Sequence, residues 1–125
     1  MKNLLICLSI IILTSLAASN IQSNFGKINV TTMTLPTQDG QHLVYDWYKP
    51  ETVSKQNKAP FIAIIPGFQR SKEALSNIAI ELSRRGYVVA LIDPYAQGLS
   101  SSSLSTRAAT TQGYGMFALV EHVYD

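Results

Sequence analysis

Two histidines and a serine-rich stretch are the residues that most suggest chemistry. A serine nucleophile needs a histidine base and an acidic residue that orients the base. His42 and His122 are the two histidines of the 125-residue sequence. The stretch 98–102 (GLSSS) has the first glycine of a Gly-x-Ser-x-Gly turn but not the last. The eight acidic residues form no convincing pair with either histidine. We therefore expect no complete catalytic set in this sequence.

Two apolar runs end in residues that mark loops. Phe61–Ile65 (FIAII) is apolar at every position and is followed by 66–69 (PGFQ). Taken alone, the Pro-Gly pair indicates a turn into the helical pattern that follows it. Asp93 closes the second run, Tyr87–Ile92 (YVVALI). We expect its carboxylate to bind loop amides, which is a structural role.

The segments before these runs predict an antiparallel hairpin. Ile28–Leu35 and Leu43–Tyr48 are rich in β-branched and aromatic residues, and Asp39-Gly40 between them is typical of a turn. Side chains alternate between the two faces of a strand. The second segment therefore carries Leu43, Tyr45 and Trp47 on one face, and Val44, Asp46 and Tyr48 on the other.

The middle of the chain predicts a β-α-β unit. The two apolar runs flank a helical pattern that begins after Ser71 and stops at Gly86. Such a unit is right-handed and places its strands parallel, which is typical of the α/β class. A second helix is expected from about Gly115. The predicted apolar faces are Leu75, Ile78, Ala79 and Leu82 in the first helix, and Met116, Leu119, Val120 and Val123 in the second.

The N-terminus has the pattern of a secretory signal. A single lysine precedes an apolar stretch of 15 residues, Leu4–Ala18, and small residues place cleavage near Ser19. We therefore divide the chain into a signal peptide, 1–19, and an exported part, 20–125. The apolar stretch is shorter than the ~20 residues that span a bilayer. An uncleaved membrane anchor is the alternative.

Composition excludes several classes of protein. A formal charge of +2 is too small and too evenly spread for a nucleic-acid binder. One cysteine, Cys7, excludes an internal disulfide and a thiolate metal site. The sequence has no metal-ligand spacing, phosphate loop or Rossmann glycine pattern. We expect no cofactor, no metal and no nucleic-acid partner.

The order of these segments resembles the first half of an α/β-hydrolase. The resemblance runs from about residue 28 to residue 125. It rests on the hairpin, on PGFQRSKEAL after the third strand, and on SRRGYVVALIDPYAQGLSSSS around the fourth. The Pro-Gly-aromatic variant is similar to that of cutinase-like and dienelactone-hydrolase-like esterases. The resemblance implies an N-terminal half-sheet with strand order 1-2-4-3, preceded by the signal peptide.

The same resemblance implies site residues. In the family, the residue after the Pro-Gly pair donates its backbone N–H to a developing oxyanion, and here that residue is Phe68. Gly67 would allow the sharp turn that aims this donor. Gln69 and Tyr95 are expected to line the acyl pocket. The implied parent is an exported serine hydrolase that acts on an ester, thioester or peptide bond in a small or polymeric substrate.

The resemblance implies that the nucleophile, acid and base of the family follow after residue 125. His42 is expected on the surface beside the hairpin turn, far from the catalytic edge, and His122 on the solvated side of the last helix. We therefore expect a truncated chain that does not turn over. Strand 61–65 would then be an unpaired edge that favours self-association. The alternatives are a binding module completed by a partner and a membrane-anchored surface protein without chemistry.

Overall fold

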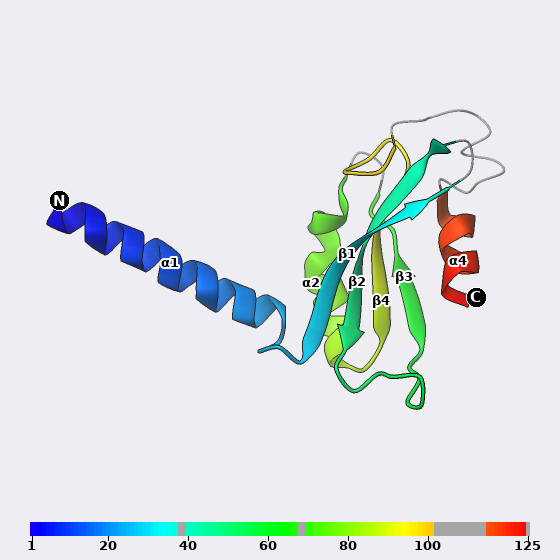
Figure 1. Ribbon diagram of the computed structural model, residues 1–125, viewed down its shortest axis with the longest axis horizontal. Coiled ribbons are helices and arrows are strands. Elements are labelled where there is room, and N and C mark those ends of the chain that lie inside the picture. The colour runs from blue at the N-terminus through cyan, green and yellow to red at the C-terminus, as the bar shows by residue number, and fades with distance from the viewer. Residues whose placement is uncertain (38–39, 68–69, 102–114, 125) are drawn as a thin grey trace.

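The fold is one four-stranded sheet with helices on both of its faces (Figure 1). The computed structural model describes residues 1–37, 40–67, 70–101 and 115–124. In chain order the elements are α1 (Lys2–Gln22), β1 (Ile28–Pro36), β2 (His42–Pro50), β3 (Phe61–Ile64), the 3₁₀ helix η2 (Lys72–Leu75), α2 (Ser76–Arg84), β4 (Val88–Asp93) and α4 (Met116–Tyr124).

The strand order is β1-β2-β4-β3, which confirms the predicted order. β1 and β2 form the predicted antiparallel hairpin, with Ile28 opposite Pro50 and Pro36 opposite His42. β2 pairs antiparallel with β4, and β4 pairs parallel with β3. The amino ends of β1, β3 and β4 therefore meet at one end of the sheet, and the carboxyl ends of β3 and β4 meet at the other.

The alternation predicted for β2 is confirmed by the two hydrophobic clusters. Leu43 and Tyr45 are buried on the face covered by α4, whereas Tyr48 is buried on the face covered by α2. β4 supplies both clusters because all six of its residues are buried. The α4-side cluster is built from Leu43, Tyr45, Ala90, Ile92, Tyr95 and Leu119, and the α2-side cluster from Ile28, Tyr48, Ala79, Val89 and Leu91.

The helix after β3 differs in two ways from the prediction. It begins with the 3₁₀ turn η2, and Ser71 stands at the N-cap without a capping bond from its side chain. Ile78, which we expected on the apolar face, is 51% exposed. The buried face is instead centred on Ala79 and Ser83. At the other end Gly86 has a φ of +94° and stops the helix as predicted.

α4 covers the opposite face of the sheet. Leu119 is fully buried, and Met116 and Val123 pack on the same cluster, as predicted. Val120 is 40% exposed, so its predicted place on the apolar face is wrong. His122 is exposed, as expected.

β3 is an edge strand, as predicted. Its neighbour on one side is β4. Ala63 within the strand and Ile65, the first residue after the strand, are exposed. An apolar edge presents backbone donors and acceptors that a further strand can use. The described sheet is therefore open on this side.

α1 extends away from the sheet (Figure 1), and every residue from Met1 to Ile21 is exposed. It is longer than the apolar stretch in the sequence. Its Lys2–Ile21 span is long and apolar enough to cross a membrane by length and composition, which corrects the expectation that it falls short. Signal peptides and membrane anchors share these properties. Cleavage near Ser19 and export stay predictions.

Candidate functional site

The candidate site lies where the carboxyl ends of β3 and β4 meet. In open α/β sheets ligands bind outside the carboxyl ends of the strands. Two loops leave the sheet here: residues 65–71 after β3 and residues 94–101 after β4. Their described parts are held together by a polar network centred on Asp93.

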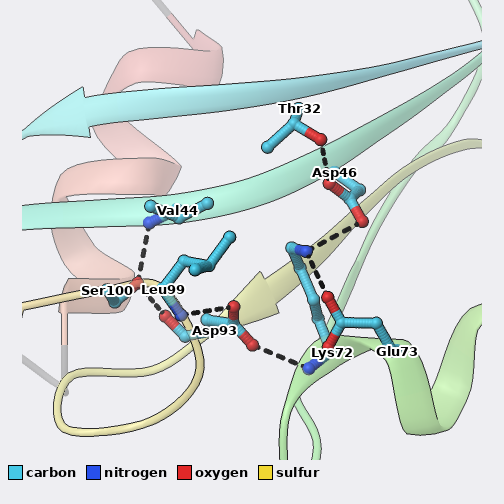
Figure 2. Close-up of polar contacts among 8 residues, drawn as sticks. All are labelled: Thr32, Val44, Asp46, Lys72, Glu73, Asp93, Leu99 and Ser100. Carbon is cyan, nitrogen blue, oxygen red and sulfur yellow. Dashed lines mark hydrogen bonds and ion pairs between the residues drawn. The ribbon is translucent and has the colours of Figure 1, made fainter.

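Asp93 connects the two loops directly. Its side chain is fully buried at the last position of β4. Oδ1 accepts a hydrogen bond from the Lys72 amide at 2.7 Å, and Oδ2 accepts one from the Leu99 amide at 3.0 Å (Figure 2). A buried carboxylate is tolerated when such donors replace its water. Asp93 therefore fixes the exit of the 65–71 loop against the 94–101 loop, which confirms the amide-binding role predicted for it.

The first bond also caps η2. Lys72 is the first residue of η2, and helices begin with amides that lack a partner within the helix. The capping oxygen comes from Asp93 of the next strand instead of the preceding Ser71. A carboxylate at this position is also favoured by the partial positive charge of a helix start.

Gly98 leaves the space that this carboxylate occupies. Its φ is +54°, a left-handed conformation that glycine adopts without strain. A Cβ at this position would lie 2.1 Å from the Asp93 carboxyl carbon. Only glycine lets the loop fold this closely over Asp93.

Ser100 and Gln97 add bonds from the same loop to its surroundings. The Ser100 hydroxyl accepts a hydrogen bond from the Val44 amide at 2.7 Å and donates one to the Asp93 carbonyl (Figure 2). Oε1 of Gln97 accepts a hydrogen bond from the Arg70 amide at 3.1 Å. The 94–101 loop is thereby tied to β2 on one side and to the 65–71 loop on the other.

His42 lies at this end of the sheet, which corrects the expectation that it is far from the catalytic edge. The reason is that β2 runs antiparallel to β4, so the start of β2 lies beside the end of β4. Nε2 of His42 is 3.1 Å from the Leu99 carbonyl, and Nδ1 is 2.9 Å from the Ser101 hydroxyl. Since a carbonyl only accepts, Nε2 donates to the Leu99 carbonyl, and Nδ1 forms a second hydrogen bond with the Ser101 hydroxyl. His42 is also half-buried, not a free surface residue.

Ser101 and His42 are joined by three hydrogen bonds. Besides the ring contact, its hydroxyl accepts a hydrogen bond from the His42 amide at 2.7 Å, and its amide donates to the His42 carbonyl at 3.0 Å. The Ser101 hydroxyl thus makes two hydrogen bonds to the same residue, one to its amide and one to its ring. This arrangement closes the 94–101 loop onto the start of β2.

Lys72 carries a buried charge close to the same loops. Its side chain is 5% exposed, and Nζ lies 2.7 Å from Glu73 and 3.2 Å from Asp46 (Figure 2). Asp46 in turn accepts a hydrogen bond from the Thr32 hydroxyl at 2.7 Å. Burial alone would lower the pKa of Lys72, but the bonds to Glu73 and Asp46 raise it above its ordinary value. Lys72 therefore stays charged, and its ion pair with Asp46 connects the start of η2 to β2.

The ion pair with Lys72 also changes the pKa of Glu73. The hydrogen bond from Lys72, with a smaller contribution from Ser71, lowers the pKa of Glu73 to about 2. Its side chain remains 62% exposed, so water screens part of the interaction.

The residues predicted for the site are only partly described. Phe68 and Gln69 lie outside the described residues. Gly67 is exposed, its φ is not left-handed, and a Cβ there would meet nothing within 4 Å. The described conformation therefore gives no steric reason for a glycine at 67. Tyr95 is 1% exposed within the α4-side cluster, and its hydroxyl bonds to Thr37. Its described place is the core, and a pocket contact for Tyr95 stays a prediction.

The sequence did not reveal Lys72, Gln97 or the bonds of His42. A lysine at the first turn of a helix has no pattern that distinguishes a buried from an exposed side chain. The Gly-x-Ser element at 98–100 was the available signal, because it places a glycine and a hydroxyl shortly after the strand that ends in Asp93.

Comparison with known proteins identifies the fold. No protein-family model and no curated protein matches the chain. Solved structures do match. The α/β hydrolase GrgF from Penicillium sp. sh18 is 22% identical with a TM-score of 0.64, and the match covers 78% of this chain and 32% of that one. An epoxide hydrolase from an endophytic Streptomyces is 18% identical with a TM-score of 0.61, covering 77% and 27%.

A third match is the thioesterase domain from the curacin biosynthetic pathway. It is 19% identical with a TM-score of 0.54, and the match covers 76% of this chain and 30% of that domain. The chain has part of the α/β-hydrolase fold. This confirms the resemblance drawn from the sequence, and the chain spans about 30% of the length of the hydrolases that it matches. At these identities the likeness shows the α/β-hydrolase fold and not the substrate.

Proposed function

We propose that this chain forms the oxyanion side of an exported serine hydrolase that cleaves an ester, thioester or peptide bond. The observation that carries the proposal is the pair of hydrogen bonds from the Lys72 and Leu99 amides to Asp93, at the carboxyl ends of β3 and β4. We call this pair of bonds the Asp93 bracket. It fixes Lys72, and thereby the exit of the 65–71 loop, by a buried charged hydrogen bond. A loop held in this way is suited to keep a backbone donor in place during a reaction.

The chemistry assigned to the loop is stabilisation of negative charge. When a nucleophile adds to a carbonyl, charge develops on the carbonyl oxygen, and preorganised N–H donors stabilise it. We assign this donor to the Phe68 amide. Gln69 and Tyr95 are the proposed contacts to the acyl group.

The nucleophile, acid and base are proposed to lie outside residues 1–125. Ser101 and His42 are in contact, but the Ser101 hydroxyl also accepts the His42 amide, and the His42 ring is held by a loop carbonyl. Both residues close a loop in this arrangement. We therefore expect the chain by itself to be catalytically inactive.

The first experiment separates these roles on the chain itself. The full chain, in mild detergent, is treated with a fluorophosphonate probe and analysed by mass spectrometry. We expect no labelled serine and no hydrolysis of a nitrophenyl ester above the rate of the Ser101→Ala variant. Specific labelling of Ser101 would instead make Ser101 and His42 a nucleophile and base, and would overturn the proposal.

The second experiment tests the donor. The gene is read past codon 125, where the proposal expects an apolar strand followed by Gly-x-Ser-x-Gly. In the protein so encoded, Phe68→Pro removes the amide hydrogen, whereas Phe68→Ala keeps it. Losing one oxyanion donor lowers kcat by about 10²–10³. We expect this loss in Phe68→Pro and a much smaller one in Phe68→Ala. Equal losses in both variants would show that the side chain matters and the amide does not.

The open edge of β3 favours a second candidate, a sheet completed by another chain or by a second copy. Ile65, directly after β3, is 48% exposed, and Ala63 is exposed within the strand. A charge on an edge strand opposes pairing. If pairing occurs, light scattering after size exclusion should show an assembly that Ala63→Lys dissociates. A monomer at all concentrations would exclude self-association.

A further inference from the structure

The end of the domain from which α1 emerges is rich in positive charge. The amino ends of β1, β3 and β4, the carboxyl end of β2 and the last turn of α2 meet here (Figure 1). Of the acidic residues that the structure describes, Glu51 and Glu81 lie at this end. Six of the ten lysines and arginines of the chain lie there: Lys27, Lys49, Lys55, Lys58, Arg84 and Arg85. We call these six residues the basic end.

All six side chains are exposed. Arg84 and Arg85 share one partner, Glu81, at 3.8 and 3.1 Å. Within the part of the chain that the structure describes, the four lysines make no ion pair. The overall charge of +2 is therefore distributed unevenly in space, which corrects the expectation that it is evenly spread. The basic end has an excess of cations that its own acids do not neutralise.

This end is also where α1 joins the domain. The helix ends at Gln22, and the turn 23–27 leads straight into β1. Nη2 of Arg84 donates to the Ile21 carbonyl at 3.2 Å, so a cation of the basic end contacts the last turn of α1. Phe25 in the turn is an apolar side chain that is 73% exposed.

We propose that the basic end is a docking surface for an anionic phospholipid bilayer, with α1 retained as the anchor that holds it there. α1 supplies about 30 Å of exposed apolar helix, which matches the hydrocarbon core. Residues 1–21 of α1 are exposed, and the 23–27 turn and the Arg84 bond connect its last turn to the domain. The turn lets the domain settle with its cations on the lipid headgroups.

Charge complementarity favours a lipid surface as the occupant. A cation close to an anionic leaflet strengthens binding about fivefold, and several act together when they lie on one end of a tethered domain. β4 has six residues, so the carboxyl ends of the strands lie roughly 20 Å from the basic end. In the docked state the Asp93 loops face away from the membrane and take substrate from the aqueous side.

The test places a fluorophore at each end of the domain. In a Cys7→Ser background, a single cysteine is introduced by Gln56→Cys in the loop between β2 and β3, or by Leu99→Cys at the opposite end. Both positions are exposed. The full-length protein is reconstituted in vesicles of phosphatidylcholine, or of phosphatidylcholine with 30% phosphatidylglycerol, that carry a headgroup quencher. Phosphatidylglycerol at roughly this fraction gives the vesicles a negative surface that attracts Lys and Arg.

We expect the protein to float with both vesicles. The label at position 56 should be quenched strongly in the anionic vesicles, weakly in the neutral ones, and released by high salt, which screens exposed charges. The label at position 99 should be unaffected in both. The inference is overturned if the protein does not float, if position 56 is quenched equally in both vesicles, or if position 99 is quenched as strongly.

Charge reversal provides a matched pair of variants. Lys49→Glu acts at the basic end, and Arg70→Glu makes the same change at the opposite end, where Arg70 is exposed. At fivefold per unit charge, Lys49→Glu should lower the ratio of docked to free domain about 25-fold. Arg70→Glu should leave it unchanged. Equal effects of the two variants would mean that net charge, and not this surface, controls binding.

Discussion

Replacing Asp93 by asparagine is the sharpest test of the bracket that joins the two loops. Asparagine keeps the shape of the side chain but has one acceptor oxygen instead of two. In the structure both carboxylate oxygens accept backbone amides, from Lys72 and Leu99. One of these amides would therefore face an NH₂ group and lose its partner in a site that is fully buried.

The size of the effect follows from the bonds that are lost. A hydrogen bond to a charged group contributes about 1.5–3 kcal/mol, so Asp93→Asn should lower the free energy of unfolding by about that amount. Asp93→Ala removes both bonds and should cost about twice as much, which approaches the ~5–15 kcal/mol total of a typical domain. Asp93→Asn is therefore the variant that should still fold.

Urea unfolding of the full chain in mild detergent measures this loss. Trp47 is a suitable probe because its ring stacks on Phe61, 5.7 Å between centroids, and this contact joins β2 to β3. With a slope of about 1–2 kcal/mol per molar urea, the midpoint should fall by about 1–2 M. Trypsin cleavage after Arg70 should also become faster, because the amide of Lys72 is released.

Glu51→Gln is the control, since Glu51 is an exposed carboxylate and the change in charge is the same. Its midpoint should stay within experimental error of the unaltered chain. If Asp93→Asn behaves like Glu51→Gln, with unchanged cleavage after Arg70, the carboxylate does not hold the two loops together and the argument for the site fails.

Two further predictions concern the same region. Gly98→Ala should lower the free energy of unfolding by about 3 kcal/mol or more, because a left-handed alanine is strained and its Cβ would overlap the carboxylate below it; Gly67→Ala, which meets nothing within 4 Å, should change it by less than about 0.5 kcal/mol in the same urea assay. Lys72 lowers the pKa of Glu73 to about 2, so the ionised Glu73 carboxylate stabilises the folded state. This stabilisation is complete above the ordinary pKa of glutamate and is lost as the pH falls from about 4.3 towards 2. Urea midpoints measured across this range should therefore fall less steeply for Glu73→Gln, and an unchanged slope would contradict the ion pair.

The strands could be predicted from the sequence because burial imposes a simple pattern on them. β4 is apolar at every position before Asp93 since both of its faces are covered, and successive side chains of β2 point to opposite faces of the sheet and join different clusters. Asp39-Gly40 indicated the hairpin between β1 and β2, whereas the order β1-β2-β4-β3 followed from the resemblance to the α/β-hydrolases.

The helices were predicted less well at the margins of their apolar faces. Periodicity gives the centre of a buried stripe, but its width depends on the elements that lie beside it. Ile78 and Val120 fall at such margins and are 51% and 40% exposed, while Ala79 and Leu119 at the centres are fully buried. A helical pattern cannot separate these cases without the neighbouring elements.

His42 was misplaced for a different reason. The hairpin assigns it to a turn, and only the pairing of β2 with β4 brings that turn to the end of β4. The position is a property of the sheet, because antiparallel pairing places the start of one strand beside the end of the other. No local pattern around His42 contains this information.

The loops of the site illustrate a general limit of sequence reasoning. Asp93 could be assigned a structural role because a buried carboxylate requires donors, and an aspartate at the end of an apolar strand has loop amides nearby. Its partners could not be named, since both donors are backbone amides and every residue except proline carries one. The residue types at 72 and 99 are therefore irrelevant to the bonds they make, and substitutions that keep the amide should preserve the bracket. The residues that the bracket does restrict are Asp93, which supplies the acceptors, and Gly98, whose missing side chain leaves room for them.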